Sequence, residues 1–160
     1  MAMRSKLELF VHLVWATKRR AERLTEDWER AAYRCMNLEA NRLNCKVLAI
    51  GGMPDHVHVV LQLASTVSVA QVVKPMKGVS SALLNDMRGE FTEPFAWQDG
   101  YAGFSLSKPH LRTVMAYVRN QKRRHATGQV WPFWEVTTEA AGRGQPGTSP
   151  EIAVEDKLGE

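Results

Sequence analysis

Two histidines separated by a single residue are the first feature of this sequence that could carry out chemistry. His56 and His58 lie in the segment 53–63, which reads Met-Pro-Asp-His-Val-His-Val-Val-Leu-Gln-Leu. From Val57 onward apolar residues recur with period two, which predicts a strand that presents both imidazoles on one face. Imidazoles placed in this way can share one divalent cation. Taken alone, the pair favours an ordinary hairpin strand with two exposed histidines, so the rest of the chain must supply further ligands.

A tyrosine and a glutamine near the end of the last predicted helix are the other candidates. Tyr117 and Gln121 are four residues apart, which places them on one helical face. Imidazoles and an amide oxygen suit Mg²⁺ or Mn²⁺ with open coordination positions better than a closed zinc site. A tyrosine hydroxyl, with an ordinary pKa of about 10, can attack phosphorus when a base or a metal assists. Each residue alone has a simpler explanation, because helical tyrosines usually pack and helical glutamines are usually solvated.

Hydrophobic periodicity predicts the elements that must position these residues. Predicted strands cover 7–16, 46–50, 57–63 and 103–107, and predicted helices follow the N-cap residues Thr25, Ser68 and Ser107. The first six elements form the β-α-β-β-α-β order of a ferredoxin-like or RRM-like sandwich, an α+β fold with an antiparallel sheet. In that topology the histidine strand is central. The last helix, which carries the tyrosine, is expected to lie across or beside the open face of the sheet.

Finer predictions concern a turn, a helix and some aromatic residues. Residues 51–55 are expected to form a tight connection in an antiparallel hairpin. Pro75 is expected to kink the helix that follows Ser68. His12 is expected to be packed or hydrogen-bonded and not a ligand. The predicted buried stripe of the Pro75 helix consists of Val69, Val72, Val73, Met76, Val79 and Leu83, and Trp131, Phe133 and Trp134 are expected to pack onto the body.

The length of 160 residues suits one domain, which we place at residues 1–137, followed by an acidic tail at 138–160 that is predicted to be disordered. The tail holds five acids and two bases, which leaves 19 bases and 12 acids in residues 1–137, a net charge of +7. A basic body of this kind favours nucleic acid as a partner, although a solubilising surface has the same composition. The candidate DNA contacts are Lys18, Arg19, Lys77, Lys122, Arg123 and Arg124.

The cysteines and the hydropathy indicate the compartment. Cys35 and Cys45 belong to no ligand spacing, which predicts a reduced, cytoplasmic protein without structural zinc. No apolar run approaches the length of a membrane span, so no membrane association is expected.

Five segments, taken in order, resemble landmarks of the HUH single-tyrosine transposases, the single-strand-DNA transposases of IS-two-hundred-like insertion sequences. The resemblance extends from about residue 8 to residue 126, and the ordered set is far more specific than the His-x-His pair. The matching segments are His-Leu-Val-Trp-Ala-Thr-Lys (12–18), Pro-Asp-His-Val-His-Val-Val-Leu (54–61), Lys-Gly-Val-Ser-Ser (77–81), Trp-Gln-Asp-Gly-Tyr-Ala-Gly-Phe-Ser-Leu-Ser (97–107) and Tyr-Val-Arg-Asn-Gln-Lys (117–122).

This resemblance implies a role for each candidate residue. His56, His58 and Gln121 match the ligands of a divalent metal, Mg²⁺ or Mn²⁺, and Tyr117 matches the nucleophile. In the family the tyrosine attacks single-stranded DNA beside a hairpin, forms a 5′-phosphotyrosine link and frees a 3′-OH. Members that transpose work as homodimers in which each tyrosine helix serves the partner's ligands, whereas related REP-associated proteins act on dispersed palindromes. The implied location is the cytoplasm, in association with the nucleoid.

Two other functions fit the same residues. A domesticated, non-catalytic module could bind DNA or RNA hairpins on an RRM-like sheet, and a metal-dependent phosphodiesterase could use water, with Tyr117 dispensable. Covalent chemistry distinguishes the transposase from both alternatives, because only the transposase forms a tyrosine–DNA adduct.

Overall fold

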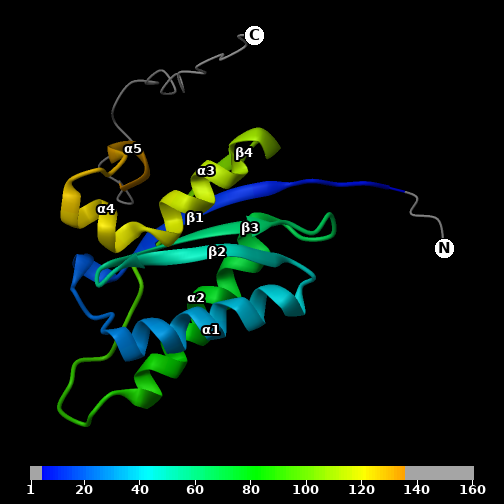
Figure 1. Cartoon of the computed structure of the whole chain (residues 1–160). Helices are drawn as coiled ribbons and strands as arrows, with labels where there is room; N and C mark the ends of the chain where they lie inside the picture. Colours follow the sequence, from blue (N-terminus) through cyan, green and yellow to red (C-terminus); the bar gives the residue numbers. More distant parts are fainter. Residues whose placement is uncertain (1–4, 136–160) are drawn as a thin grey trace.

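The chain folds around an antiparallel sheet that has helices on both faces, as a computed structural model of residues 5–135 shows (Figure 1). The elements, in chain order, are β1 (Phe10–Ala16), η1 (Lys18–Arg20), α1 (Glu26–Arg42), β2 (Lys46–Met53), β3 (His56–Gln62), α2 (Val69–Met87), β4 (Ala102–Leu106), α3 (Lys108–Arg119), α4 (Gln121–Thr127) and α5 (Pro132–Glu135).

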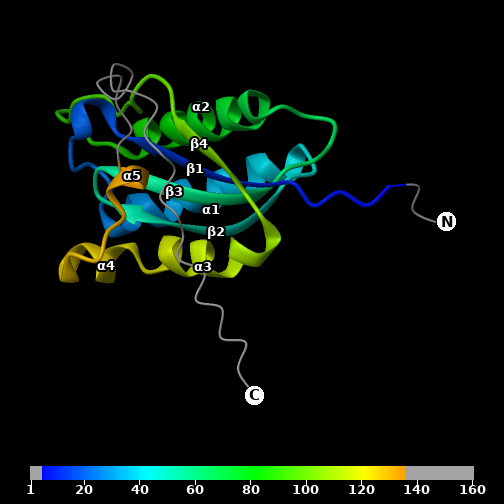
Figure 2. The same ribbon diagram turned by 90° about the horizontal axis from the view of Figure 1, so that it is seen from above.

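The strand order is β2-β3-β1-β4, and each neighbouring pair is antiparallel. This is the predicted β-α-β-β-α-β arrangement, with β1 and β3 in the centre. In their register Val14 lies opposite His58 and Ala16 lies opposite His56. Helices α1 and α2 cover one face of the sheet, and α3, α4 and α5 lie on the other (Figures 1 and 2).

The two faces of β3 serve different layers. Val57, Val59 and Leu61 belong to the main apolar core beneath α1 and α2. Val60, on the other face, packs in a second cluster with Val118 of α3. Since α3 covers this second face, the two histidines of β3 are buried and not exposed.

The helices begin where the sequence predicts. The Thr25 side chain accepts a hydrogen bond from the Trp28 N–H at the start of α1. Ser68 and Gln71 form a reciprocal capping box at the start of α2. Helix α2 continues through Pro75 as one element, so the expected kink does not divide it.

The buried stripe of α2 differs from the prediction in its second half. Val79 is 42% exposed, and the buried positions after Met76 are Ser80 and Leu84 in place of Val79 and Leu83. The reason is a hydrogen bond that periodicity of apolar residues does not reveal. The Ser80 hydroxyl donates to the carbonyl of Met76 (2.6 Å) and accepts from the indole N–H of Trp97 (3.0 Å).

The first two strands also differ from their predicted limits. β1 begins at Phe10, and Leu7 and Leu9 outside it are exposed. β2 continues to Met53, so Gly51 and Gly52, which the sequence predicts to lie in the turn, lie inside the strand. A Cβ atom on Gly51 would lie 2.0 Å from the backbone oxygen of Val118. The glycine is therefore required by the close approach of α3 to the strand, and not by a turn.

The final predicted helix is divided in two. Asn120, with φ −101° and ψ 24°, separates α3 from α4. Its side-chain amide donates to the carbonyl of Ala116, the acceptor that its own backbone N–H also uses. Asparagine side chains compete in this way with the helical ladder. Helix α4 ends at Gly128, as predicted, in the left-handed conformation.

No helix within residues 5–135 is long and apolar enough to span a membrane. The predicted acidic tail at 138–160, and with it the predicted domain boundary at 137, lies outside the described residues.

The contact between Gly51 and α3 yields a prediction about stability. Gly51→Ala should lower the free energy of unfolding by about 1–3 kcal/mol, because the new methyl group meets a backbone oxygen that cannot rotate away. The matched control is Gly78→Ala, where the Cβ meets nothing within 4 Å in the middle of α2. That change should raise the free energy of unfolding by about 0.5–1 kcal/mol. Urea denaturation measures both, and equal stabilities of the two variants would contradict the packing described.

Candidate active site

The two histidines of β3 lie side by side on the face that α3 covers. Their ring centroids are 5.1 Å apart. His56 is 1% exposed and His58 is wholly buried. The alternation of the strand accounts for their common face, and burial means that both nitrogens of each ring need partners within the protein.

Helices α3 and α4 bring the other two predicted residues to this pair. The ring of Tyr117, itself buried, meets the ring of His58 edge-on, with centroids 5.8 Å apart. Gln121 donates from its amide nitrogen to the carbonyl of Tyr117. Its amide oxygen lies 3.4 Å from Nε2 of His56. All four residues singled out in the sequence therefore meet in one place, and they do so within a single chain.

The structure adds two residues that the sequence argument missed. His125 lies four residues after Gln121, and its Nε2 is 3.1 Å from the same amide oxygen. A signal existed, since Tyr117, Gln121 and His125 continue a four-residue spacing. No sequence pattern pointed to Glu135, because this residue lies beyond the predicted helices, at the end of an aromatic segment. Its carboxylate oxygens lie 2.9 Å from Nε2 of His56, 3.3 Å from His125 and 3.4 Å from His58.

These donors fit a divalent cation. One ligand atom from each of His56, His125 and Glu135 lies within 4.8 Å of the others. The amide oxygen of Gln121 adds a fourth donor beside His56. Imidazole nitrogens with carboxylate and amide oxygens are a borderline-to-hard ligand set, compatible with Mg²⁺, Mn²⁺ and other divalent metals. Because Glu135 is negatively charged, this site attracts a cation more strongly than the neutral histidines and glutamine predicted from the sequence would do alone.

A second layer of hydrogen bonds orients the rings of His56 and His58. Nδ1 of His56 is 2.7 Å from Oδ1 of Asp55, and Nδ1 of His58 is 2.9 Å from Nε2 of His12. His12 is therefore the hydrogen-bonded histidine that was expected. Burial lowers the pKa of His12 to about 3, and the neighbouring His58 contributes to the shift, so this ring stays neutral. Partners at the outer nitrogen leave Nε2 of both His56 and His58 directed at the shared site.

The electrostatics of the two histidines differ. Burial lowers the pKa of His56, but the carboxylates of Glu135 and Asp55 outweigh burial, so its pKa is raised overall. Burial dominates at His58, and its pKa is lowered despite the same Glu135. Partial burial of the Glu135 carboxyl would raise its pKa, yet hydrogen bonds from His56, His58 and Tyr117 hold that pKa well below the ordinary value. An anion is thus fixed among the rings.

The tyrosine hydroxyl is engaged and covered. It donates a hydrogen bond to Glu135 and accepts one from the backbone N–H of Trp131 (3.0 Å). Burial, followed by the bond to Glu135, raises the pKa of Tyr117 to about 12. Trp131 stacks on its ring at 4.5 Å and 7°, and Trp134 packs edge-on against it. The packing predicted for these two tryptophans is present, and the segment 131–135 closes the site.

The basic residues predicted to contact DNA occupy different environments. Lys18 and Arg19 in η1 and Arg123 in α4 are exposed. The Lys122 ammonium pairs with Glu29 (2.6 Å). Arg124 lies over the ring of Tyr117, 4.8 Å from its centroid. Lys77 donates to the carbonyls of Gln98 and Gly100, each at 2.7 Å, so its ammonium holds a loop.

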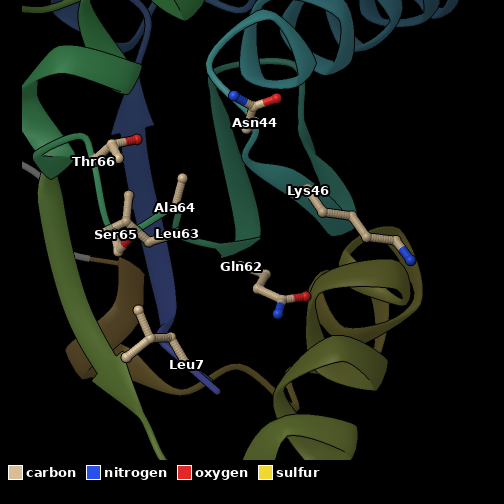
Figure 3. A pocket seen from close by; sticks show the side chains of 8 residues that line it. All are labelled: Leu7, Asn44, Lys46, Gln62, Leu63, Ala64, Ser65 and Thr66. Carbon is tan, nitrogen blue, oxygen red and sulfur yellow. The ribbon is translucent and has the colours of Figure 1, made fainter. Parts of the chain in front are cut away.

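Two hollows lie near the sheet. One of about 470 Å³ lies at the Gln62 end of β3, the end away from the histidines, and is lined by both polar and apolar residues, among them Lys46 and Leu7 (Figure 3). The other, of about 290 Å³, runs beside β2 between α1 and the α3–α4 junction, and Gln121 and Arg123 are among its lining residues. Only the second reaches the site.

Comparison with known proteins gives a consistent result. A family model described as "Transposase IS200 like" matches residues 5–121. The fold is similar to the crystal structure of a candidate transposase from Deinococcus radiodurans R1, at a TM-score of 0.61 and 23% identity over 76% of this chain and 96% of that one. It is also similar to a REP-associated tyrosine transposase solved with a REP hairpin, at a TM-score of 0.57 and 14% identity over 90% of this chain and 87% of that one. No curated protein matched the sequence.

The carboxylate of Glu135 yields a prediction about two pKa values. An adjacent anion favours an imidazolium and disfavours a phenolate, so it raises the pKa of both His56 and Tyr117. Glu135→Gln should therefore lower both pKa values. Histidine ring NMR titrations would follow His56, and phenolate absorbance compared with Tyr117→Phe would follow Tyr117. Glu26→Gln, a neutralisation on the exposed surface of α1, should change neither, and unchanged values in Glu135→Gln would show that the carboxylate does not act on the site.

Proposed function

Because the chain belongs to the family of IS200-like transposases, we propose that it cleaves and rejoins single-stranded DNA through a covalent link to Tyr117. His56, His58 and Gln121 would hold a divalent cation, Mg²⁺ or Mn²⁺, with His125 and Glu135 as further donors. A cation held there would polarise the scissile phosphate and stabilise negative charge on its oxygens.

One observation carries the proposal. The carboxylate of Glu135 lies within reach of three imidazoles and accepts the hydrogen bond of the Tyr117 hydroxyl. An anion therefore sits between the candidate metal ligands and the candidate nucleophile. A phosphodiester bound in that place would have the hydroxyl on one side and the ligand set on the other, which is the arrangement that attack on phosphorus requires.

The reaction that follows is a phosphoryl transfer in which the number of phosphodiester bonds is conserved. The oxygen of Tyr117 forms a bond to phosphorus as the bond from phosphorus to the 3′-oxygen breaks. The phenolic proton passes to solvent, and the 3′-oxygen takes up a proton from water. The products are a 5′-phosphotyrosine and a free 3′-OH, and attack by a 3′-OH on the same phosphorus reverses the step. With a pKa of about 12, the phenol depends on the site for activation.

The site must open before DNA can enter. Trp131 covers the ring of Tyr117, and Glu135 occupies the hydroxyl. The proposed reaction therefore requires residues 131–135 to move aside, after which a DNA base could stack on the exposed ring of Tyr117.

We propose a DNA hairpin as the recognition element, since one structural relative was solved with a REP hairpin. Lys18 and Arg19, which precede Arg20, and Arg123, which lines one hollow with Gln121, are exposed and would contact its phosphates, so binding should weaken as salt is raised. The proposal extends to a homodimer. The chain's own tyrosine lies against its own His58, which favours a site within each subunit over the shared arrangement expected from the resemblance.

The covalent intermediate is the decisive test of this function. Wild-type protein, with Mn²⁺ and a single strand built from the DNA that flanks its own gene, should give an SDS-resistant adduct that maps to residues 111–122. Tyr117→Phe should lose the adduct and cleavage together, by about 10³-fold or more. His56→Ala should also stop cleavage while most hairpin affinity remains, because phosphate contacts supply it. A cut without an adduct would identify a water-using phosphodiesterase, and binding without any cut would identify a binding module.

The location of the site within one chain gives a further prediction. A mixture of Tyr117→Phe and His56→Ala proteins should remain inactive, because every site would lack either the nucleophile or a ligand. Subunit exchange would be verified with two affinity tags. Recovery of cleavage in verified heterodimers would show instead that the tyrosine acts on the partner's ligands.

A further inference from the structure

Two consecutive arginines adopt left-handed backbone conformations next to the site. Arg19 has a φ of 57° and Arg20 a φ of 51°. Residues with a Cβ rarely adopt this region, and such strain is retained where the surroundings enforce it, often at functional sites. Here the turn is tied to the β2–β3 hairpin, since Thr17 donates from its backbone N–H to the carbonyl of Asp55 (2.8 Å) and Arg20 donates to that of Thr17 (2.9 Å).

The strained turn directs the guanidinium of Arg20 to the site. Its Nε donates to Oδ2 of Asp55 (3.2 Å), and its Nη1 donates to the backbone carbonyl of Glu135 (3.3 Å). Its Nη2 lies 3.4 Å from Nδ1 of His56. The same Asp55 therefore orients the ligand histidine with one oxygen and this arginine with the other.

The contact with Glu135 indicates what the guanidinium is placed to bind. The carboxylate of that residue lies among the imidazoles and holds the Tyr117 hydroxyl, while its carbonyl oxygen accepts from Arg20. When residues 131–135 move aside, the position of this oxygen becomes available to an oxygen of the substrate. Guanidinium groups stay charged at all working pH values and match the geometry of phosphate oxygens.

We propose that Arg20 is a catalytic residue that binds a non-bridging oxygen of the scissile phosphate. This inference rests on the proposed function. As Tyr117 forms its bond to phosphorus and the bond to the 3′-oxygen breaks, negative charge gathers on the non-bridging oxygens, and a fixed cation beside them stabilises that charge. Lys18 and Arg19, on the same turn, are exposed and suited to contacts with flanking phosphates.

The competing explanation is that Arg20 only holds Asp55, and through it His56. The two explanations predict different responses to a neutral phosphate. A methylphosphonate at the scissile position replaces one non-bridging oxygen by a methyl group and removes its charge. A residue that acts by neutralising that charge loses its importance on such a substrate. A residue that only supports His56 remains equally important.

The experiment compares Arg20→Ala, Arg20→Lys and a matched control, Arg30→Ala, which removes an exposed arginine of α1 paired only with Glu26 among the ion pairs of residues 5–135. Each protein is given the strand built from the DNA flanking its own gene, with Mn²⁺, bearing either a phosphodiester or each separated methylphosphonate diastereomer. On the phosphodiester, Arg20→Ala should slow adduct formation by about 10²–10³-fold relative to Arg30→Ala, and Arg20→Lys should recover part of the loss. On one methylphosphonate diastereomer the difference should shrink to within a few-fold.

Equal rates for Arg20→Ala and Arg30→Ala on the phosphodiester would overturn the inference. A defect of the same size on all three substrates would also overturn it and assign Arg20 a positioning role. If Arg20→Ala does not fold, the same comparison is made with Arg20→Lys, whose misplaced charge should still cost less on the methylphosphonate. Absence of any adduct with wild-type protein would instead contradict the proposed function itself.

Discussion

Two imidazoles buried beneath a helix must find partners for four nitrogen atoms, and much of this structure is arranged around that requirement. An unsatisfied buried polar atom costs stability, so the second face of the sheet cannot be an ordinary apolar layer. His12 and Asp55 meet the outer nitrogens, and the inner nitrogens face Gln121 and Glu135. The inner side is the one where a cation could replace these contacts, because it already gathers several donors around one small volume.

The covering helix depends on a close backbone contact with β2. Helix α3 can cross β2 closely because Gly51 has no side chain, and the carbonyl of Val118 occupies the space. The next residue toward the amino end of α3 is the tyrosine. Two carbonyls of the β2 edge, those of Leu48 and Gly52, also accept hydrogen bonds from Arg119 and Lys122. Strand, helix and edge therefore set the position of Tyr117 together, which is the rigid support that a precise site needs.

The site as it stands is closed, and its closure uses the groups that the reaction would use. Glu135 pairs with His56 and accepts the hydrogen bond of the Tyr117 hydroxyl, and Trp131 covers the ring, while Nε2 of His58 is buried without a hydrogen-bond partner among residues 5–135. Burial raises the pKa of Tyr117 and lowers that of His58, so a dry, closed site resists ionisation. DNA and a cation would each compete with Glu135. A DNA phosphate would compete with the Glu135 carboxylate for the Tyr117 hydroxyl, and a cation would compete with the histidines for the carboxylate oxygens.

Local signals in the sequence were enough to predict the first six strands and helices of the sandwich and their order, because periodicity and helix caps depend only on neighbouring residues, but they did not predict the division of the last helix at Asn120. Thr25, Ser68 and Gly128 mark helix ends in the structure as they do in the sequence. The alternation in β3 was enough to place His56 and His58 on one face, and the four-residue spacing was enough to place Gln121 near Tyr117. Tertiary structure decided what local patterns cannot contain. Gly51 is predicted as a turn residue, but the close approach of α3 explains it. Ser80 is absent from the predicted buried stripe, but its hydrogen bond with Trp97 lies in the core. Glu135 has no neighbour in sequence that links it to His56, 79 residues earlier. Contacts between residues so far apart in the sequence form only when the whole fold packs, so local sequence patterns cannot predict them.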